Sequence, residues 1–507
     1  MGRKSPRTFD RVLAKSLELV HDFVMNQLFD DFWPLFVAVA HTLIIAVASS
    51  HVVLTKRDNR SAIGWVGIIW LTPFLGAMLY YLFGINRIHR VAKRLREGQE
   101  PTRTGWQASA ASQSEVLAIL AEENESLRAL VSFIGKVTDL PLLPGNRITP
   151  LKDGDIAYAA MLSAIAKAQR SISLATYIFD NDEVGREFAD ALAAAQQRGV
   201  QVRVLIDSVG TRYTWPSILS HLRKLEVRHA VFLPTLIPWQ LHYTNLRNHR
   251  KILVIDGKLG FTGGMNIRQG HRKTNPGHHP VQDLHFQVEG PVVAHLQETF
   301  AHDWEFTTNE VIGGDLWFPQ IPKAGPALCR GISDGPELSF DKLQLTLQGA
   351  IDCARHRIVI MTPYFLPELP LITALVVAAL RGVQVQILLP EKNNLRLVQW
   401  ASTALLWQVL QHGCRVYLTP QPFDHTKLVL VDNCWSMFGS ANWDPRSLRL
   451  NFEMNIECYD DTLADDLAQL VADKLARSRE ITLKDVDSRP IWMRLRDGIA
   501  RLAQPYL

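Results

Sequence analysis

The pattern of apolar and charged positions divides the chain into two unlike parts. No Asp, Glu, Lys or Arg occurs at residues 32–55, and a second uncharged run covers residues 61–86. Each run is longer than the roughly 20 apolar residues that cross the hydrocarbon core of a membrane as a helix. The pattern therefore predicts two transmembrane helices, at about 32–55 and 61–86, within a membrane anchor formed by residues 1–96.

The charges around these runs predict their orientation. More basic residues follow the second run, at residues 87–96, than lie in the short hairpin at residues 56–60. Because cytoplasmic flanks are enriched in Lys and Arg, the rest of the chain is expected on the cytoplasmic side. A cleaved signal peptide is a poorer interpretation because about thirty residues precede the first run. Two buried core helices would seldom stay uncharged over such a length.

Beyond the anchor, the pattern changes to alternating helix and strand periods. Residues 97–144 are expected to form a polar linker and then a helix near residues 115–133. From about Gly145, helical periods at 157–168 and 183–198 alternate with strand-like runs at 171–179 and 200–207. This order predicts an α/β fold in which helices flank a mixed sheet.

The sequence also contains an internal repeat. The segment "RGVQVRVL" at 198–205 returns as "RGVQVQIL" at 381–388, and each copy follows a helical period and an aromatic-ended strand, at Tyr177 and Tyr364. Segments repeated in the same order indicate a duplicated unit. We therefore expect two pseudo-symmetric α/β domains, at residues 145–325 and 326–507.

Composition narrows the possible functions. The formal net charge is +4 and the pI is near 8.7, which argues against a strongly basic nucleic-acid-binding protein. The five cysteines are widely and irregularly spaced, without a CxxC pair. We therefore expect reduced, mostly buried thiols in a cytosol-facing domain, and no metal site built from them.

Both copies of the repeat carry the same short motif: a His, a Lys two positions later, an Asp, a Gly and an Asn. These residues are His249, Lys251, Asp256, Gly263 and Asn266 in the first copy, and His425, Lys427, Asp432, Gly439 and Asn442 in the second. Residues two apart on a strand share one face, so each His and Lys should point the same way. Each Asp lies at an odd spacing from its His, so we expect it to point elsewhere and hold loop backbone.

Two such motifs facing each other could surround a phosphate group. Two ammonium groups, two imidazoles and two carboxamides would stabilise a phosphoryl transition state without a metal ion. One neutral imidazole can attack phosphorus, and the other, protonated, can donate to the leaving oxygen. Each imidazole also needs an orienting partner, and Asp283 and Glu453 lie on strand-like segments downstream of the two motifs. A core histidine beside a surface lysine explains one motif but explains two matched copies poorly.

A His-rich segment follows the first motif. Residues 267–283 contain His271, His278 and His279, which could suggest a metal site. Their irregular spacing favours solvated loop histidines instead.

The paired motifs resemble the HxKxxxxD signature of the phospholipase D superfamily. Further stretches are similar to the bacterial cardiolipin synthases of that superfamily, among them "GNRITPLKDGDIAYAAMLSAI", "MTPYFLPE", "GSANWDPRSLRLNFEMNIE" and the closing "RPIWMRLRDGIARLAQPYL". The resemblance covers residues 33–507 and includes the two apolar runs. It implies a multi-pass enzyme of the bacterial cytoplasmic membrane with two phospholipase D-type domains, phospholipid substrates, no cofactor and no metal.

The resemblance also implies a reaction. The family transfers a phosphatidyl group from one phosphatidylglycerol to another through a phosphohistidine, which forms cardiolipin and releases glycerol. By this resemblance His249 is the nucleophile, and His425 is the general acid and then the base. Asp283 would orient His249 and Glu453 would orient His425. The remaining signature residues are Lys251, Asp256, Lys427 and Asp432, and the implied phosphate ligands are Lys251, Lys427, Asn266 and Asn442.

Several alternatives remain open from sequence. Water attack on the phosphohistidine would make the protein a phospholipase D-type hydrolase, and another acceptor such as phosphatidylethanolamine would fit equally well. A nuclease is disfavoured because no long basic groove with aromatic residues is evident. A catalytically inert membrane scaffold is disfavoured because both motifs are intact. The oligomeric state stays open.

Overall fold

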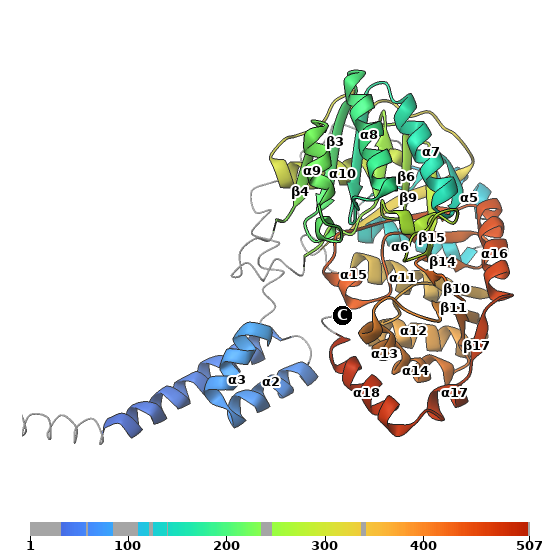
Figure 1. Ribbon diagram of the computed structural model, residues 1–507. Coiled ribbons are helices and arrows are strands. Elements are labelled where there is room, and N and C mark those ends of the chain that lie inside the picture. Colours follow the sequence, from blue (N-terminus) through green and yellow to red (C-terminus); the bar gives the residue numbers. More distant parts are fainter. Residues whose placement is uncertain are drawn as a thin grey trace, which may run out of the picture. The chain divides into compact units, whose positions relative to one another are not determined.

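The computed structural model describes residues 32–56, 59–84, 110–120, 125–138, 140–234, 246–335 and 341–504 (Figure 1). The chain divides into two compact units, Met1–Arg87 and Ile88–Leu507.

Among the described residues of the N-terminal unit, one helix, Phe32–Thr55 with 24 residues, is long and apolar enough to cross a membrane, as predicted for this segment. The second predicted span is not confirmed, because residues 59–84 form three shorter pieces: α2 (Asn59–Leu71), α3 (Pro73–Leu79) and the π-helix η1 (Tyr80–Gly84). The chain leaves helical geometry at Thr72 (φ −141°, ψ 72°), since proline disfavours the helical conformation in the residue before it. Residues 85 and 86 of the predicted span lie outside the described part.

The larger unit is built on one mixed sheet, which has 15 strands among the described residues. From the centre to one edge, the first half contributes strands in the order β1-β8-β6-β5-β2-β3-β4. Their bounds are β1 Leu143–Lys152, β2 Ser171–Thr176, β3 Gln201–Asp207, β4 His229–Phe232, β5 Ile252–Ile255, β6 Leu259–Gly263 and β8 Leu284–Glu289. The neighbours β2, β3 and β4 are parallel, whereas the remaining pairs are antiparallel.

The second half repeats this arrangement in mirrored order, β9-β16-β15-β14-β10-β11-β12, with β17 added at the edge. Its strands are β9 Ala327–Asp334, β10 Arg357–Met361, β11 Gln384–Pro390, β12 Arg415–Thr419, β14 Leu428–Val431, β15 Trp435–Gly439, β16 Glu453–Tyr459 and β17 Arg479–Ile481. The two halves join where β1 pairs antiparallel with β9. The mixed sheet and the internal repeat are therefore as predicted, and the two copies share one sheet.

Helices cover both faces of the sheet. They are α5 Gln113–Ile119, α6 Glu125–Thr138, α7 Asp153–Lys167, α8 Glu183–Gln197, α9 Ile218–Lys224, α10 Val293–Thr308, α11 Lys342–Cys353, α12 Leu369–Leu380, α13 Arg396–Thr403, α14 Leu406–Leu410, α15 Pro445–Arg449, α16 Asp461–Leu475, α17 Leu483–Asp487 and α18 Ile491–Leu502. Short elements are the 3₁₀ helices η3 Gly210–Arg212 and η5 Gln269–His271, and the strands β7 Val281–Gln282 and β13 Phe423–Asp424. The helix predicted near 115–133 is replaced by α5 and α6, and α6 packs in the core of the second half.

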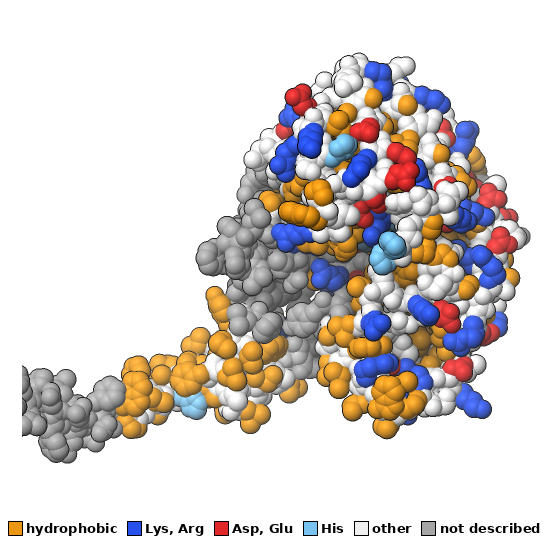
Figure 2. Space-filling model, viewed as in Figure 1, with side chains coloured by type: hydrophobic (Ala, Val, Ile, Leu, Met, Phe, Trp, Pro, Cys, Tyr) orange, Lys and Arg blue, Asp and Glu red, His pale blue; other side chains and the backbone are white. Residues whose placement is uncertain are grey.

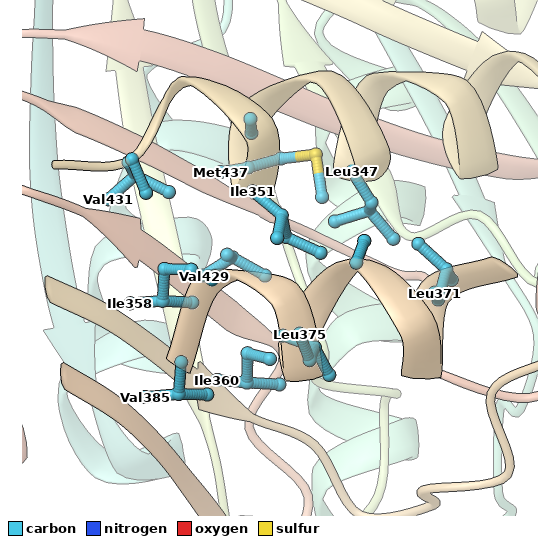
Figure 3. Close-up of a cluster of buried hydrophobic side chains, with 14 of the residues drawn as sticks. Leu347, Ile351, Ile358, Ile360, Leu371, Leu375, Val385, Val429, Val431 and Met437 are labelled. Atoms are coloured by element: carbon cyan, nitrogen blue, oxygen red, sulfur yellow. The ribbon is translucent and has the colours of Figure 1, made fainter. Parts of the chain in front are cut away.

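The strands are apolar on both faces because each face is covered. In β14, Val429 and Val431 lie in the core under α11 and α12, as Figure 3 shows. The alternate residues Leu428 and Leu430 lie in another core, which includes α10, α16 and strands of both halves. This shared core fixes the two halves, and therefore their histidine motifs, relative to each other.

The cysteines agree with the sequence prediction. All five are free, and four of them, Cys329, Cys414, Cys434 and Cys458, are buried.

Candidate active site

Both histidine motifs lie in extended segments that lead into central antiparallel strands. His249 and Lys251 directly precede β5, and His425 and Lys427 directly precede β14. The extended backbone places each His and Lys on the same side, as the spacing of two predicts. His249 and both lysines are buried, with Lys251 only 2% and Lys427 only 4% exposed. The structure therefore buries three of the four basic side chains of the motifs, and the fourth, His425, is half-buried.

Each histidine segment pairs with a segment of the opposite half. The backbone N–H of His249 donates to the carbonyl of Phe452 at 2.9 Å, next to Glu453. In the matching place, the N–H of His425 donates to the carbonyl of Gln282 at 2.8 Å, next to Asp283, where β7 and β13 pair in parallel. These two short bridges bring each histidine beside a carboxylate from the other copy of the repeat.

The carboxylates consequently cross between the halves. His249 Nδ1 lies 3.0 and 3.1 Å from the two carboxylate oxygens of Glu453, and His425 Nδ1 lies 2.9 Å from Oδ2 of Asp283. The predicted assignment, with Asp283 on His249 and Glu453 on His425, is wrong. Each carboxylate instead contacts the histidine of the opposite half, because of the bridges described above.

The charge state of the first pair suits a nucleophile. Burial opposes ionisation of Glu453, but the facing His249, its hydrogen bond and Lys251 outweigh this effect and hold the pKa of Glu453 at about 2. Burial also lowers the pKa of His249 to about 4, although Glu453 acts in the opposite direction. His249 is therefore neutral near pH 7. Because a carboxylate only accepts, the proton sits on Nδ1 and the lone pair is on Nε2.

Burial and neighbouring charges also shift the pKa values of the second pair, His425 and Asp283. Burial lowers the pKa of His425 well below its usual value, and the positive charges of Lys427 and Lys251 lower it further. Burial raises the pKa of Asp283, opposed mainly by Lys427. Charges of the first motif thus act on the histidine of the second motif, which is expected when both line one site.

The lysines are held by the backbone of their own motifs. Lys251 Nζ donates to the carbonyl of His249 at 2.6 Å, and Lys427 Nζ donates to the carbonyl of His425 at 2.6 Å. Burial lowers the pKa of Lys251 to about 7 and that of Lys427 to about 8. A buried ammonium group without a full counter-charge is poised to hold an anion, because the anion restores the interactions lost with water.

The motif aspartates hold turns away from the histidines, as their odd spacing predicted. The Asp256 carboxylate accepts from the backbone N–H groups of residues 169–171, and Asp432 accepts from those of residues 355–357. Both residues have positive φ, 52° and 53°. Their hydrogen bonds tie each tight turn to the start of the neighbouring strand, so their contribution to the site is structural.

The two asparagines lie close to the motifs but differ in their bonding. Asn266 Oδ1 accepts from the backbone N–H of Ile178 at 3.1 Å. Asn442 Oδ1 is buried and has no hydrogen-bond partner among the described residues. Their role as phosphate ligands stays a prediction.

Two tyrosines border the histidines, although the sequence pattern indicates them only as the ends of strands. The Tyr177 ring lies 5.2 Å from the His249 ring, edge to face, and 5.5 Å from Lys251 Nζ. The Tyr364 ring lies 6.5 Å from that of His425. The aromatic residue at the same place in both copies was the available signal, and these rings form apolar walls beside the imidazoles.

The His-rich segment was only partly predicted. His278 and His279 are exposed, as expected for loop residues. His271 is buried, 2% exposed, and its ring lies 6.4 Å from Tyr158 and 6.5 Å from His425, so its prediction as a solvated residue is wrong. Burial lowers its pKa to about 3, which leaves a neutral imidazole beside the second motif. Among the described residues, no group of three or more His, Cys, Asp or Glu could hold a metal ion.

Comparisons with known proteins agree with this geometry. The family model described as cardiolipin synthase, PLD-like domain, matches residues 161–304 and 347–475, and a phospholipase D-nuclease N-terminal model matches residues 43–84. The chain is 33% identical to cardiolipin synthase A of Pseudomonas putida (strain GB-1) over 92% of this chain and 96% of that protein. It is 32% identical to cardiolipin synthase A of Pseudomonas entomophila (strain L48) over 94% of this chain and 98% of the relative.

A solved structure shares the fold. The phosphatidylserine synthase of Haemophilus influenzae Rd KW20 superimposes with a TM-score of 0.58 and 16% identity, covering 76% of this chain and 100% of that chain. At this identity the match shows the fold alone. With the family model matching both halves and the relatives matching nearly the whole length, the chain belongs to the cardiolipin synthase family of phospholipase D-like proteins.

Proposed function

We propose that this protein is a cardiolipin synthase that transfers a phosphatidyl group between two phosphatidylglycerol molecules through a phosphohistidine on His249. The observation that carries the proposal is the crossed pair of carboxylate–histidine contacts, Glu453 with His249 and Asp283 with His425, beside two buried lysines. The names of the relatives, cardiolipin synthase A, support phospholipids as substrates. No metal ion is required for this chemistry.

The first step makes a phosphorus–nitrogen bond. His249 Nε2 attacks the phosphorus of the first phosphatidylglycerol, and the bond from phosphorus to the headgroup glycerol oxygen breaks. The leaving oxygen takes a proton from His425. A neutral nucleophile is available because burial keeps the pKa of His249 low. The arriving phosphodiester anion would favour the protonated form of His425 and so supply the acid.

The second step reverses these roles. His425, now neutral, takes the proton of the terminal headgroup hydroxyl of a second phosphatidylglycerol. The hydroxyl oxygen attacks phosphorus, the phosphorus–nitrogen bond breaks, and cardiolipin leaves. Lys251 and Lys427 would hold the non-bridging phosphate oxygens in both steps, with Asn266 and Asn442 as further ligands, because preorganised donors stabilise charge that develops in the transition state. Glu453 and Asp283 keep each Nδ1 protonated and each ring oriented.

For its location we propose the bacterial cytoplasmic membrane, with the catalytic unit on the cytoplasmic side. The helix Phe32–Thr55 is the span supported best. A second crossing needs the broken helices between residues 59 and 84 to reach the other face, which proline permits when neighbouring groups satisfy the freed backbone. Topology reporters fused after residue 56 and after residue 110 test this, since one crossing and two crossings give opposite sides for the second reporter.

The direct test is product analysis. The purified full chain receives phosphatidylglycerol alone, with a chelator present, and the lipid and water-soluble products are measured by mass spectrometry. The proposal predicts cardiolipin and glycerol in equal amounts, with no product from His249→Ala. His412→Ala, at an exposed histidine, is the matched control and should keep full turnover. Phosphatidic acid as the main lipid product would instead make the protein a hydrolase.

A further inference from the structure

The helix α18 exposes apolar residues and buries a charged residue, which is the reverse of an ordinary surface helix. An amphipathic helix usually buries its apolar side and exposes its polar side. In α18 the side turned inward carries Asp497, which is 1% exposed, and the side turned outward carries large apolar residues. The outward residues, which we call the apolar stripe, are Ile491 (77% exposed), Trp492 (57%), Leu495 (63%), Ile499 (59%) and Leu502 (77%).

Specific contacts fix this orientation. Asp497 forms ion pairs with Arg489 and Arg496, and the Arg496 guanidinium lies 4.3 Å from the centroid of the Trp400 ring on α13. Ala500 packs in a small core with Leu366, Val398, Ala401 and Leu405. After the helix, the Gln504 side chain donates to the carbonyl of Leu366 at 3.1 Å. Because the inward face is anchored by charge and packing, the apolar stripe is a fixed feature of the surface.

The chemistry around the stripe identifies its partner. Figure 2 shows hydrophobic side chains gathered over α18 with basic side chains close by. The helix itself contains Arg494, Arg496 and Arg501 and one acidic residue, the buried Asp497. Leu395 and Leu397, at the start of the neighbouring α13, are also exposed. Leucine, isoleucine and tryptophan beside arginine form the pattern of helices that lie in the interface of a bilayer and attract anionic lipid.

We infer that α18 is a membrane-contact helix: the apolar stripe inserts into the headgroup and upper acyl region of a bilayer that contains anionic lipid, and Arg494 and Arg501 lie at the phosphate level. This contact belongs to the unit that carries the histidine motifs and is separate from the apolar helix of the N-terminal unit. The core of a protein interface is depleted of charged residues, whereas a helix that lies on an anionic bilayer combines large apolar residues with Arg or Lys, as α18 does with Arg494 and Arg501.

The location of α18 links the membrane contact to the proposed reaction at the second histidine motif. The core under α18 includes Leu366, and Tyr364 packs against the same core. The Tyr364 ring borders His425 at 6.5 Å. On the basis of the proposed function, α18 holds the second half-site next to the lipid surface, where an acceptor lipid can enter without leaving the bilayer.

The test measures insertion directly and needs no turnover. Ile499 is replaced by Cys in the full chain, in which the half-buried Cys353 is changed to Ser, and the thiol is labelled with an environment-sensitive fluorophore. Ile156→Cys, at an exposed apolar residue of α7 (54% exposed), is the matched control. Both proteins are reconstituted into vesicles of phosphatidylcholine with phosphatidylglycerol.

We expect the label at 499 to shift its emission to the blue and to be quenched by lipids that carry a spin label near the headgroup. The label at 156 should be quenched by aqueous iodide instead. The Arg494→Gln change should weaken insertion about fivefold in vesicles with anionic lipid and much less in phosphatidylcholine alone. Equal iodide quenching at both positions would overturn the inference. The inference would also be overturned if position 499 stayed protected in detergent and formed cross-links between two chains. A protein that synthesises no cardiolipin but inserts α18 would refute the proposed function only.

Discussion

Replacing Glu453 by Gln tests whether the second half of the chain orients the nucleophile of the first half. Glu453 is fully buried, contacts His249 Nδ1 with both oxygens and also accepts from Asn451 Nδ2 at 3.2 Å. Glutamine has nearly the same shape and keeps one acceptor oxygen. The change therefore removes the negative charge while disturbing the packing little.

The expected magnitude follows from the contact that is lost. A hydrogen bond to a charged partner contributes about 1.5–3 kcal/mol and a neutral one about 0.5–1.5 kcal/mol. Turnover should therefore fall about tenfold if a neutral bond remains, and up to about 150-fold if the imidazole loses its orientation. The pH profile should also move. Glu453 raises the pKa of His249 against the effect of burial, so removing its charge lowers that pKa further, and the acidic limb of kcat/KM shifts to lower pH.

The assay follows cardiolipin formation by mass spectrometry across pH for the wild type, Glu453→Gln and Asp283→Asn. Asp283 contacts His425, so Asp283→Asn should reduce turnover without moving the limb that belongs to His249. Chemical denaturation of each variant separates loss of folding from loss of orientation. If Asp283→Asn shifts the acidic limb and Glu453→Gln leaves it unchanged, the crossed assignment of the carboxylates is refuted.

Three further changes test other parts of the site. Binding of inorganic phosphate should weaken above about pH 7 by about tenfold per pH unit for each lysine that loses its proton, because Lys251 and Lys427 have pKa values of about 7 and about 8; calorimetry over neutral to alkaline pH checks this, and a constant Kd contradicts it. Asp432→Asn should lower the free energy of unfolding by about 1–3 kcal/mol, since its carboxylate accepts from three backbone N–H groups; lost turnover at unchanged stability in denaturant would speak against a structural role. Gly264→Ala would place a methyl group 2.4 Å from an Asp283 oxygen and should cut turnover at least tenfold by displacing that carboxylate from its histidine, an expectation that wild-type turnover would disprove.

Local patterns were sufficient to predict the motifs and the repeat. His249 and Lys251 share a face because residues two apart on an extended segment always do, and matched segments in matched order indicated duplication without any three-dimensional information. The turn role of Asp256 was also accessible, since its odd spacing directed it away from the histidine.

The partner of each histidine could not be predicted in the same way. Asp283 follows His249 within one copy of the repeat, so a pairing inside each half was the simplest expectation. The true pairing depends on the bridge between Asn248 and Phe452 and on the pairing of β7 with β13, which join segments far apart in the chain. No periodicity or composition signals such contacts.

Two other differences between the sequence-based predictions and the structure, an unconfirmed second span and a buried His271, have physical causes. Pro73 lies within an apolar run long enough to span, and hydropathy alone cannot decide whether proline kinks one helix or ends it. His271 sits in a polar, proline-containing segment that predicts a loop. Its burial arises because Tyr158 of α7 packs against its ring, and that contact depends on the tertiary fold.

The central claim is that His249 attacks phosphorus while His425 serves the leaving group and the acceptor. A phosphatidyl-p-nitrophenol substrate tests it most directly, because its leaving group needs no acid. The full chain carrying His425→Ala should release about one p-nitrophenol per site in a burst and then stop, with a phosphatidyl adduct on His249 identified by mass spectrometry after rapid quenching. The absence of a burst, or an adduct on another residue, would contradict the account.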